Sequence, residues 1–303
     1  MHNEPMKFLV GDNPFHGISH LSQARARERV DLKNLNDVEQ AAKLVKLSLQ
    51  NGADGFMFSV SETTLSILTN VCIDEEKVEP SLYAIVPYAY EYVRLAAQVG
   101  GVSGLAKRVA KQVVTSANLK AAAFGLYGII NNFDFSSFLK AYILYEHSRI
   151  KSAAGKNAHI KSILLHEIIT EMALALNMDW LFRSYVKFMS GLGIQPGFET
   201  RNFAYLVSKL REWQIDFGKV TIATPFNKVG FQMNPSKEKC EESLQIAADS
   251  EIIAMSVLAA GYLKPPDAID YLRCLPNISG VVIGVSKEHH AQETFKLLRK
   301  TLT

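Results

Sequence analysis

Two apolar runs near the carboxyl end of the chain decide the fold: residues 252–258, IIAMSVL, and residues 280–285, GVVIGV. Each run passes through a turn into a pattern typical of a helix. Continuous runs rich in Val and Ile are typical of strands buried on both faces, as parallel sheets require. Small residues where each strand ends leave room for a ligand, and the following helix can present free N–H groups to an anion. This stretch therefore predicts two consecutive strand–helix units.

The same unit repeats back along the whole chain. Six further apolar runs read as strands, each ended by a turn: residues 7–10, 55–60, 82–86, 163–167, 195–198 and 220–223. Eight parallel strands joined by right-handed crossovers are satisfied most simply by a closed (β/α)8 TIM barrel. A doubly wound open sheet is the alternative, but no Gly-rich phosphate loop follows the first run, where that fold usually carries one. We predict a single α/β barrel domain over residues 1–303.

One connection is too long for a single crossover helix. Between the third and fourth strands the sequence predicts helices around residues 92–111 and 135–151, with an apolar, aromatic segment between them. We interpret this stretch as the third crossover helix followed by a helical insertion at 112–156. Insertions in such folds often cover the ligand end as a lid or form an oligomer interface. A homo-oligomer is therefore left open.

The composition is ordinary for a globular protein and excludes several classes. Hydrophobic residues make up 48% of the 303 residues and charged residues 21%, with a net charge of +3. The basic residues are dispersed, which argues against a nucleic-acid partner. Three widely separated cysteines indicate a reducing compartment and no disulfide framework. No secretory signal and no run long enough for a membrane span is visible, so we expect a cytoplasmic protein with a small-molecule substrate.

In a barrel, the active site lies at the carboxyl ends of the strands. This rule selects the polar residues that end or follow each predicted strand: Asp12, Asn13, His16, Ser59, His166, Glu167, Glu199, Asn202, Asn227, Ser256, Ser286 and Lys287. We predict catalytic roles for Asp12, His16, His166 and Glu167.

The pair His166-Glu167 is the strongest of these signals, because it directly follows the apolar run 163–165. A charged group next to a buried strand must find a partner or solvent. Adjacent strand residues point to opposite faces, so only one of the two is expected to face the barrel interior. His166 could donate a proton, polarise a substrate by hydrogen bonding or bind a metal. The alternative is a strand-end histidine satisfied by a backbone carbonyl.

Two further groups carry open alternatives. Asp12 or His16 could orient a substrate, or the segment 12–16 could simply be a turn fixed by Asx hydrogen bonds and proline. Glu199 could pair with Glu167 as two carboxylates, and a nearby histidine would make a divalent-metal site conceivable, although no compact ligand spacing supports one. Asn13, Ser59, Glu199 and Asn227 are expected to contact the substrate.

At residues 160–298 the chain resembles the aldo-keto reductases. The segments 252–261 (IIAMSVLAAG) and 281–286 (VVIGVS) are similar to the closing repeat of that family, and 196–200 (PGFET) and 224–227 (TPFN) to its middle strands. His166 matches the family's histidine after the fourth strand. The first half departs from the pattern. Of the family's catalytic Asp, Tyr, Lys and His only His166 is retained, with Phe58 or Ser59 at the aspartate position and Pro87-Tyr88 where the lysine is expected.

The resemblance implies a barrel and, if a nicotinamide cofactor binds, a site for NADP(H). That site would comprise Asn202, Phe226, Ser256, Gly284, Ser286 and Lys287, with the phosphate near Ser286 and Lys287, the ring against Phe226 and the amide near Asn202. Tyr88 is expected to contact the substrate, and Tyr88, Tyr90 or His166 could replace the missing proton donor.

Three hypotheses follow for function. The first is an enzyme acting on a small polar or anionic substrate, an oxidoreductase if NADP(H) binds. The second is a lyase, isomerase or hydrolase using His166, Glu167 and Glu199, with or without a metal. The third is a binding protein on a barrel that has lost catalysis.

Overall fold

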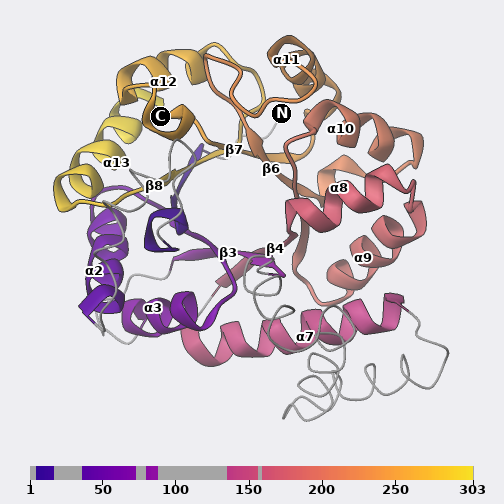
Figure 1. Cartoon of the computed structure of the whole chain (residues 1–303), viewed down its shortest axis with the longest axis horizontal. Helices are drawn as coiled ribbons and strands as arrows, with labels where there is room; N and C mark the ends of the chain where they lie inside the picture. Colours follow the sequence, from indigo (N-terminus) through magenta and orange to yellow (C-terminus); the bar gives the residue numbers. More distant parts are fainter. Residues whose placement is uncertain (1–4, 17–35, 73–79, 88–134, 156–158, 303) are drawn as a thin grey trace, which may run out of the picture.

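The computed structural model describes residues 5–16, 36–72, 80–87, 135–155 and 159–302. In these parts of the chain, eight parallel strands form a closed barrel in the order β1 to β8, and helices surround it (Figure 1). The barrel closes where β1 pairs with β8 in parallel, from Lys7 beside Gly280 to Gly11 beside Gly284. The predicted TIM barrel is confirmed.

The strands agree with the sequence prediction to within a few residues at either end. They are β1 Lys7–Gly11, β2 Gly55–Ser59, β3 Ser81–Val86, β4 His159–Leu165, β5 Gln195–Glu199, β6 Thr221–Pro225, β7 Glu251–Met255 and β8 Gly280–Gly284.

The helices follow the strands in turn. The α-helices are α2 Asn36–Gln50, α3 Glu62–Cys72, α7 Phe135–Ala154, α8 Glu167–Ala175, α9 Asp179–Gly191, α10 Phe203–Glu212, α11 Lys237–Ile246, α12 Pro265–Arg273 and α13 Glu288–Leu302. Short 3-10 helices are η1 Asn13–His16, η2 Phe217–Lys219 and η3 Ala259–Gly261. Helix α13 packs against α2, so the last helix closes the ring of helices around the barrel (Figure 1).

Helix α7 bears on the predicted insertion. It lies between α3 and α9 in the ring and packs against both (Figure 1). The carboxyl-terminal part of the predicted insertion, 112–156, therefore includes the helix that occupies the third crossover position. Residues 112–134 lie outside the described residues, and an insertion there stays a prediction.

Alternation along the strands divides the core into two layers. Leu9, Met57, Tyr83, Leu164 and Ile253 point into the barrel and pack together. Their sequence neighbours, such as Phe8, Val10, Phe56 and Phe58, point outward into the layer between sheet and helices. This period of two, with both faces apolar, is why the strands read as continuous hydrophobic runs.

A buried polar network fills the amino end of the barrel. The Glu251 carboxylate accepts hydrogen bonds from the Tyr83 hydroxyl at 2.7 Å and the Thr221 hydroxyl at 2.8 Å. The Lys7 ammonium lies 3.3 Å from the same carboxylate. These groups satisfy one another, so the network fills the interior at this end, opposite the carboxyl ends of the strands.

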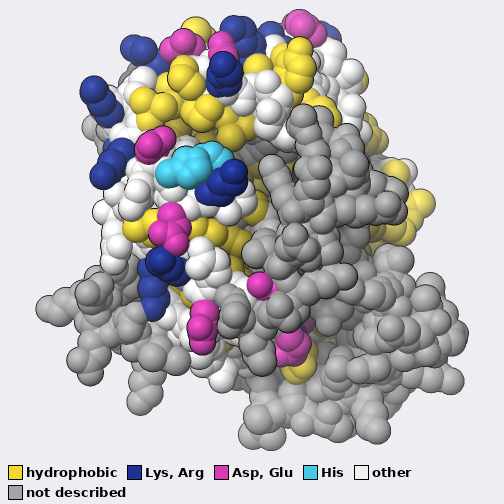
Figure 2. Space-filling model, turned by 60° about the vertical axis from the view of Figure 1, so that its left-hand side comes forward, with side chains coloured by type: hydrophobic (Ala, Val, Ile, Leu, Met, Phe, Trp, Pro, Cys, Tyr) yellow, Lys and Arg dark blue, Asp and Glu magenta, His cyan; other side chains and the backbone are white. Residues whose placement is uncertain are grey.

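The surface of the described residues is mixed in charge. Figure 2 shows Lys and Arg side chains interspersed with Asp and Glu side chains over the part of that face that is described. None of the described helices combines the length and the apolar character needed to cross a membrane.

Candidate active site

A cavity of about 330 Å³ opens at the carboxyl ends of the strands. Its apolar floor includes Met57, Ile85, Met255 and Val282, which continue the barrel interior. Its described polar lining comprises Asp12, Asn13, Ser59, His166, Glu167, Glu199, Arg201, Gln232, Ser256, Ser286 and His290. A concave site in which polar groups converge above an apolar floor is a usual form of small-molecule site.

Helix α8 begins at once after β4 and sets the orientation of His166. Strand β4 ends at Leu165, His166 is the N-cap of α8, and its Nδ1 accepts the Ile168 backbone N–H at 3.2 Å. Burial lowers the pKa of His166, so the neutral ring predominates at neutral pH. A neutral ring whose Nδ1 is an acceptor carries its proton on Nε2. His166 is therefore a hydrogen-bond donor at the cavity.

The helical start corrects one expectation from the sequence. Residues 166 and 167 were expected at the end of a strand, with only one side chain facing inward. Because both residues belong to the first turn of α8 rather than to β4, strand alternation does not apply, and both His166 and Glu167 line the cavity.

Glu199 is the titratable group best suited to proton transfer. It ends β5, and its Oε2 accepts the Glu167 backbone N–H at 3.2 Å and lies 4.0 Å from the Nε2 of His166. Burial raises the pKa of Glu199 from 4.5 to about 7, opposed by the Glu167 N–H and by the Arg201 charge. A carboxyl group with a pKa near neutrality can both accept and donate a proton at physiological pH.

Glu167 and Arg201 form an ion pair beside Glu199. The Nε of Arg201 lies 2.7 Å from Oε2 of Glu167. Burial and the nearby Glu199 charge raise the pKa of Glu167, while Arg201 acts against this shift. Arg201 is fixed in turn by Glu171 on α8, whose Oε1 accepts the Arg201 backbone N–H at 2.8 Å and the Thr200 hydroxyl at 3.0 Å.

Asp12 joins β1 and β2 at the opposite side of the cavity. Its Oδ2 accepts the Ser59 backbone N–H at 2.7 Å and lies 3.2 Å from Nε2 of His16. Asp12 lines the cavity, as does Asn13, whereas His16 packs behind Asp12. The structure thus places His16 as a partner of Asp12 rather than beside the cavity.

The ends of β7 and β8 form the remaining wall. Ser256, Gly284 and Ser286 line the cavity as predicted. The space beside Gly284 is already filled, since a Cβ built there would lie 2.7 Å from the Pro14 ring. Gly284 therefore allows the first loop to pack closely and does not itself leave room for a ligand.

Besides His16, four predicted residues lie away from the cavity. Phe226 is fully buried and packs edge-on against Phe203, with ring centroids 5.4 Å apart, so it belongs to the core and not to a cofactor-binding face. Asn227 is also fully buried, and its side chain is bonded to the backbone of Phe231. Asn202 precedes α10 outside the lining, and Lys287 is exposed. Tyr88 lies outside the described residues.

Three polar residues that line the cavity are not among the site residues selected from the sequence: Arg201, Gln232 and His290. Arg201 directly follows the predicted segment at the end of β5, and strand-end position alone would have identified it. Gln232 follows β6 by several residues, so only the loop conformation brings it to the cavity. His290, near the start of α13, is exposed and also lines the cavity.

The alternative of a divalent-metal site is not supported by a preformed set of ligands among the described residues. No group of three or more His, Cys, Asp and Glu side chains among these residues is arranged to hold a metal ion.

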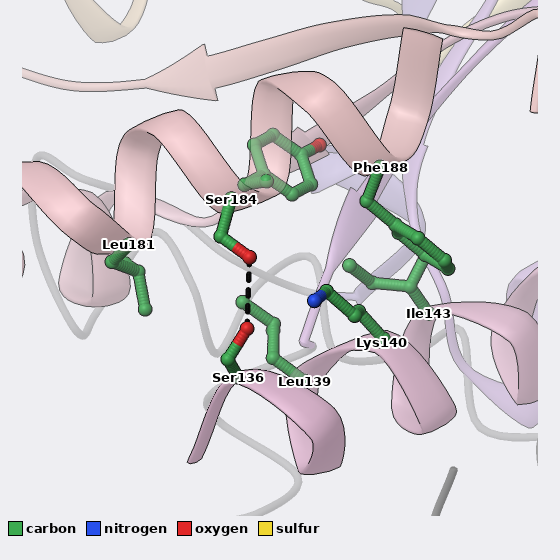
Figure 3. Close-up of a pocket in the computed structure, with 8 residues that line it drawn as sticks. Ser136, Leu139, Lys140, Ile143, Leu181, Ser184 and Phe188 are labelled. Atoms are coloured by element: carbon green, nitrogen blue, oxygen red, sulfur yellow. Dashed lines mark hydrogen bonds between the residues drawn. The ribbon is translucent and has the colours of Figure 1, made fainter. Parts of the chain in front are cut away.

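A second, much smaller cavity lies between α7 and α9. It has a volume of about 10 Å³ and is lined by Ser136, Lys140, Ser184 and Phe188, among others (Figure 3). The hydroxyls of Ser136 and Ser184 are hydrogen-bonded across it at 2.8 Å. A space of this size holds at most about one water molecule, so it is a packing gap between two helices.

Comparison with known proteins shows the fold alone. No family model and no curated protein matches the sequence. PA4992, a candidate aldo-keto reductase from Pseudomonas aeruginosa, superposes with a TM-score of 0.60 at 11% identity, covering 98% of this chain and 90% of that one. A second structure of a candidate aldo-keto reductase from the same organism gives 0.60 and 11%, covering 99% and 95%. The resemblance expected from the sequence is thus confirmed for the barrel.

An orotidine 5'-monophosphate decarboxylase from Methanocaldococcus jannaschii, solved with the inhibitor BMP, is also similar. Its TM-score is 0.46 at 13% identity, with 99% of both chains covered. A likeness this weak carries no argument about the site.

Proposed function

We propose that this protein is an enzyme that moves a proton at a carbon next to a carbonyl group of a small polar molecule, as isomerases, epimerases and some lyases do. The observation that carries the proposal is the pairing of Glu199, whose pKa is raised to about 7, with the Nε2–H of His166, 4.0 Å away. One group can accept the proton while the other stabilises the charge that forms on the carbonyl oxygen.

The roles divide by chemistry. Glu199 is the proton acceptor and donor, because its raised pKa matches the working pH. His166 is the hydrogen-bond donor to the carbonyl oxygen, because its Nδ1 is already an acceptor for α8. The Glu167–Arg201 pair places a cation beside Glu199, which keeps a fraction of that carboxyl ionised. Asp12 borders the opposite side of the cavity, where it could bind a substrate hydroxyl.

Exchange of hydrogen with solvent tests the proposal. The protein in D2O would be incubated with aldoses, ketoses and 2-hydroxy acids, and loss of the proton signal next to the carbonyl or carboxyl carbon would be followed by NMR. We expect exchange for at least one compound with the native protein and none with Glu199→Gln. Exchange that persists at the native rate in Glu199→Gln would contradict the assignment of the base.

Nicotinamide-dependent reduction is the second candidate, and the fold likeness to the candidate aldo-keto reductases favours it. The residues present fit NADP(H) poorly. The aromatic ring expected against the nicotinamide, that of Phe226, is fully buried, and Lys287 does not line the cavity. We therefore derive no step through this cofactor. Titration with NADPH, followed by its fluorescence and by the thermal unfolding of the protein, tests this candidate. Saturable binding of NADPH would favour nicotinamide-dependent reduction over the proposed function.

A further inference from the structure

We infer that Gln232 and Ser256 form a wall that binds substrate hydroxyl groups, and that the substrate is a neutral polyhydroxylated carbonyl compound of the sugar class. The inference rests on the proposed function, since it names the molecule on which the acid–base groups act. Four independent features of the described residues carry it.

The first feature is where the backbone adopts unusual conformations. Seven non-glycine residues in the described chain have positive φ angles. Asn177 and Gln214 follow the C-caps of α8 and α10, where a left-handed residue ends the helix. Three of the other five line the cavity: Gln232, with φ of 60°, Ser256, with φ of 53°, and Ala260, with φ of 58°. Gln232 lies in the turn that the Met233 N–H closes on the Gly230 carbonyl, and it and Ser256 are the two of these three with polar side chains. Positive φ angles at non-glycine residues gather at binding sites, so this grouping marks the wall as a candidate site.

The second feature is how firmly Gln232 is held. Asn227, fully buried, donates from its amide to the Phe231 carbonyl at 2.8 Å and accepts the Phe231 N–H at 2.7 Å. On the other side of Gln232, Met233 is buried, and the Asn234 N–H donates to the Arg201 carbonyl at 3.0 Å. The loop is therefore fixed before any ligand arrives, and it lies next to the segment that carries Arg201.

The third feature is the chemistry of the two side chains. A carboxamide and a hydroxyl each donate and accept hydrogen bonds, as the hydroxyl groups of a sugar also do. Among the described residues, neither the Gln232 amide nor the Ser256 hydroxyl has a hydrogen-bond partner, although both are half-buried at the cavity. A bound polyol would satisfy both groups.

The fourth feature is charge. The cavity is lined by the carboxyl groups of Asp12, Glu167 and Glu199, and the only arginine in its described lining, Arg201, is already paired with Glu167. Like charges at close range disfavour an anionic substrate. This narrows the sequence-based expectation of a polar or anionic substrate to a neutral one.

Ligand sets that share a carbon skeleton test the inference. D-erythrose, D-xylose and D-glucose, their alditols and their aldonates would be titrated into the full-length protein by calorimetry. We expect at least one aldose and its alditol to bind, and the corresponding aldonate to bind more weakly. Absence of binding by all the aldoses and alditols, or tighter binding of an aldonate, would overturn the inference.

The variant Gln232→Gly removes the side chain without disturbing the backbone, because glycine tolerates the positive φ angle. We expect binding of the aldose and alditol to weaken about five- to tenfold, the loss of one or two neutral hydrogen bonds, with no fall in melting temperature. Gln214→Gly is the matched control, since it changes the same residue type at a φ of 53° on an exposed helix end. Equal binding by both variants would overturn the role of Gln232.

Alditols separate this inference from the proposed function, because they lack the carbonyl group that proton transfer requires. Alditol binding that depends on Gln232, without deuterium exchange into any sugar, would support hydroxyl binding by Gln232 and Ser256 and contradict the proposed function. Exchange into a 2-hydroxy acid that is unaffected by Gln232→Gly would support proton transfer and overturn hydroxyl binding by these two residues.

Discussion

The Oε2 of Glu199 lies 4.0 Å from the Nε2 of His166 and accepts the backbone N–H of Glu167 at 3.2 Å. One carboxylate at the end of β5 is thus oriented by the first turn of α8, and the N-cap of that same helix is the neighbouring hydrogen-bond donor. The arrangement places an acid–base group and a hydrogen-bond donor at the carboxyl ends of two adjacent strands, β5 and β4.

Replacing Glu199 by glutamine should greatly slow turnover while leaving substrate binding nearly intact. Glutamine keeps the size of the side chain and an acceptor for the Glu167 N–H, but it cannot accept a proton from carbon. We expect the rate to fall about 10²- to 10⁴-fold, the usual contribution of a positioned general base. Initial rates of deuterium exchange at saturating substrate would measure it.

Glu212→Gln provides the control, because Glu212 is an exposed carboxylate on the outer helix α10. The rate of this variant should match that of the native protein. A similar loss in both variants would show that the Glu199 effect is not local.

The raised pKa of Glu199 also predicts how stability depends on pH. A carboxyl group whose pKa is higher in the folded state binds its proton more tightly there, so its contribution favours folding at low pH. That contribution is complete below 4.5 and is lost as the pH rises through about 7. The native protein should therefore lose up to about 3 kcal/mol of unfolding free energy relative to Glu199→Gln across this interval.

Urea unfolding of both proteins at a series of pH values would measure the difference. A difference that stays constant with pH would mean that the Glu199 carboxyl group titrates normally.

The strand positions could be predicted because they depend on local pattern. Strands with both faces buried are mostly apolar on both faces, as 281–283 in β8 show, and the turns that follow are rich in Gly, Pro and Asn. The carboxyl-end rule then brought His166, Glu167, Glu199 and Asp12 together correctly.

The parts that were missed depend on contacts distant in sequence or on weak periodicity. Helix α8, which was not predicted, has exposed apolar residues at Ile168 and Met172 and at its C-cap Leu176, so its sequence shows no clear polar face to mark it as a helix. The burial of Phe226 is set by its packing on Phe203, and the pairing of Arg201 with Glu167 joins two different strand ends. No local pattern encodes either contact.

The two functions of His166 can be separated by comparing two substitutions. His166→Asn retains a side-chain acceptor for the helix N-terminus but loses the Nε2 donor, whereas His166→Ala loses both. We expect both variants to lose turnover, and only the alanine variant to lose about 1 kcal/mol of stability through the missing cap. Thermal unfolding and exchange rates together would show this. Full activity in His166→Asn would exclude the donor role.

The amino end of the barrel should affect stability without affecting the reaction. Tyr83→Phe removes the hydroxyl that donates to Glu251 at 2.7 Å and leaves a buried carboxylate with fewer partners. We expect a loss of about 2 kcal/mol in unfolding free energy, since the hydrogen bond is made to a charged group. Exchange rates at a temperature where both proteins are folded should be equal. A marked change in rate would mean that the two ends of the barrel are coupled.

Asn227→Ala should alter the substrate site from a position that does not touch it. The substitution leaves the N–H and C=O of Phe231 without the side-chain bonds that now fix the loop, at a cost of about 1–3 kcal/mol. Because the Gln232 amide is then no longer held at the cavity, affinity for the substrate should fall while the pH dependence of exchange, set by Glu199, stays the same. Titration calorimetry and a pH–rate profile would separate these effects. A shifted profile with unchanged affinity would show that the loop acts on the acid–base groups instead of on binding.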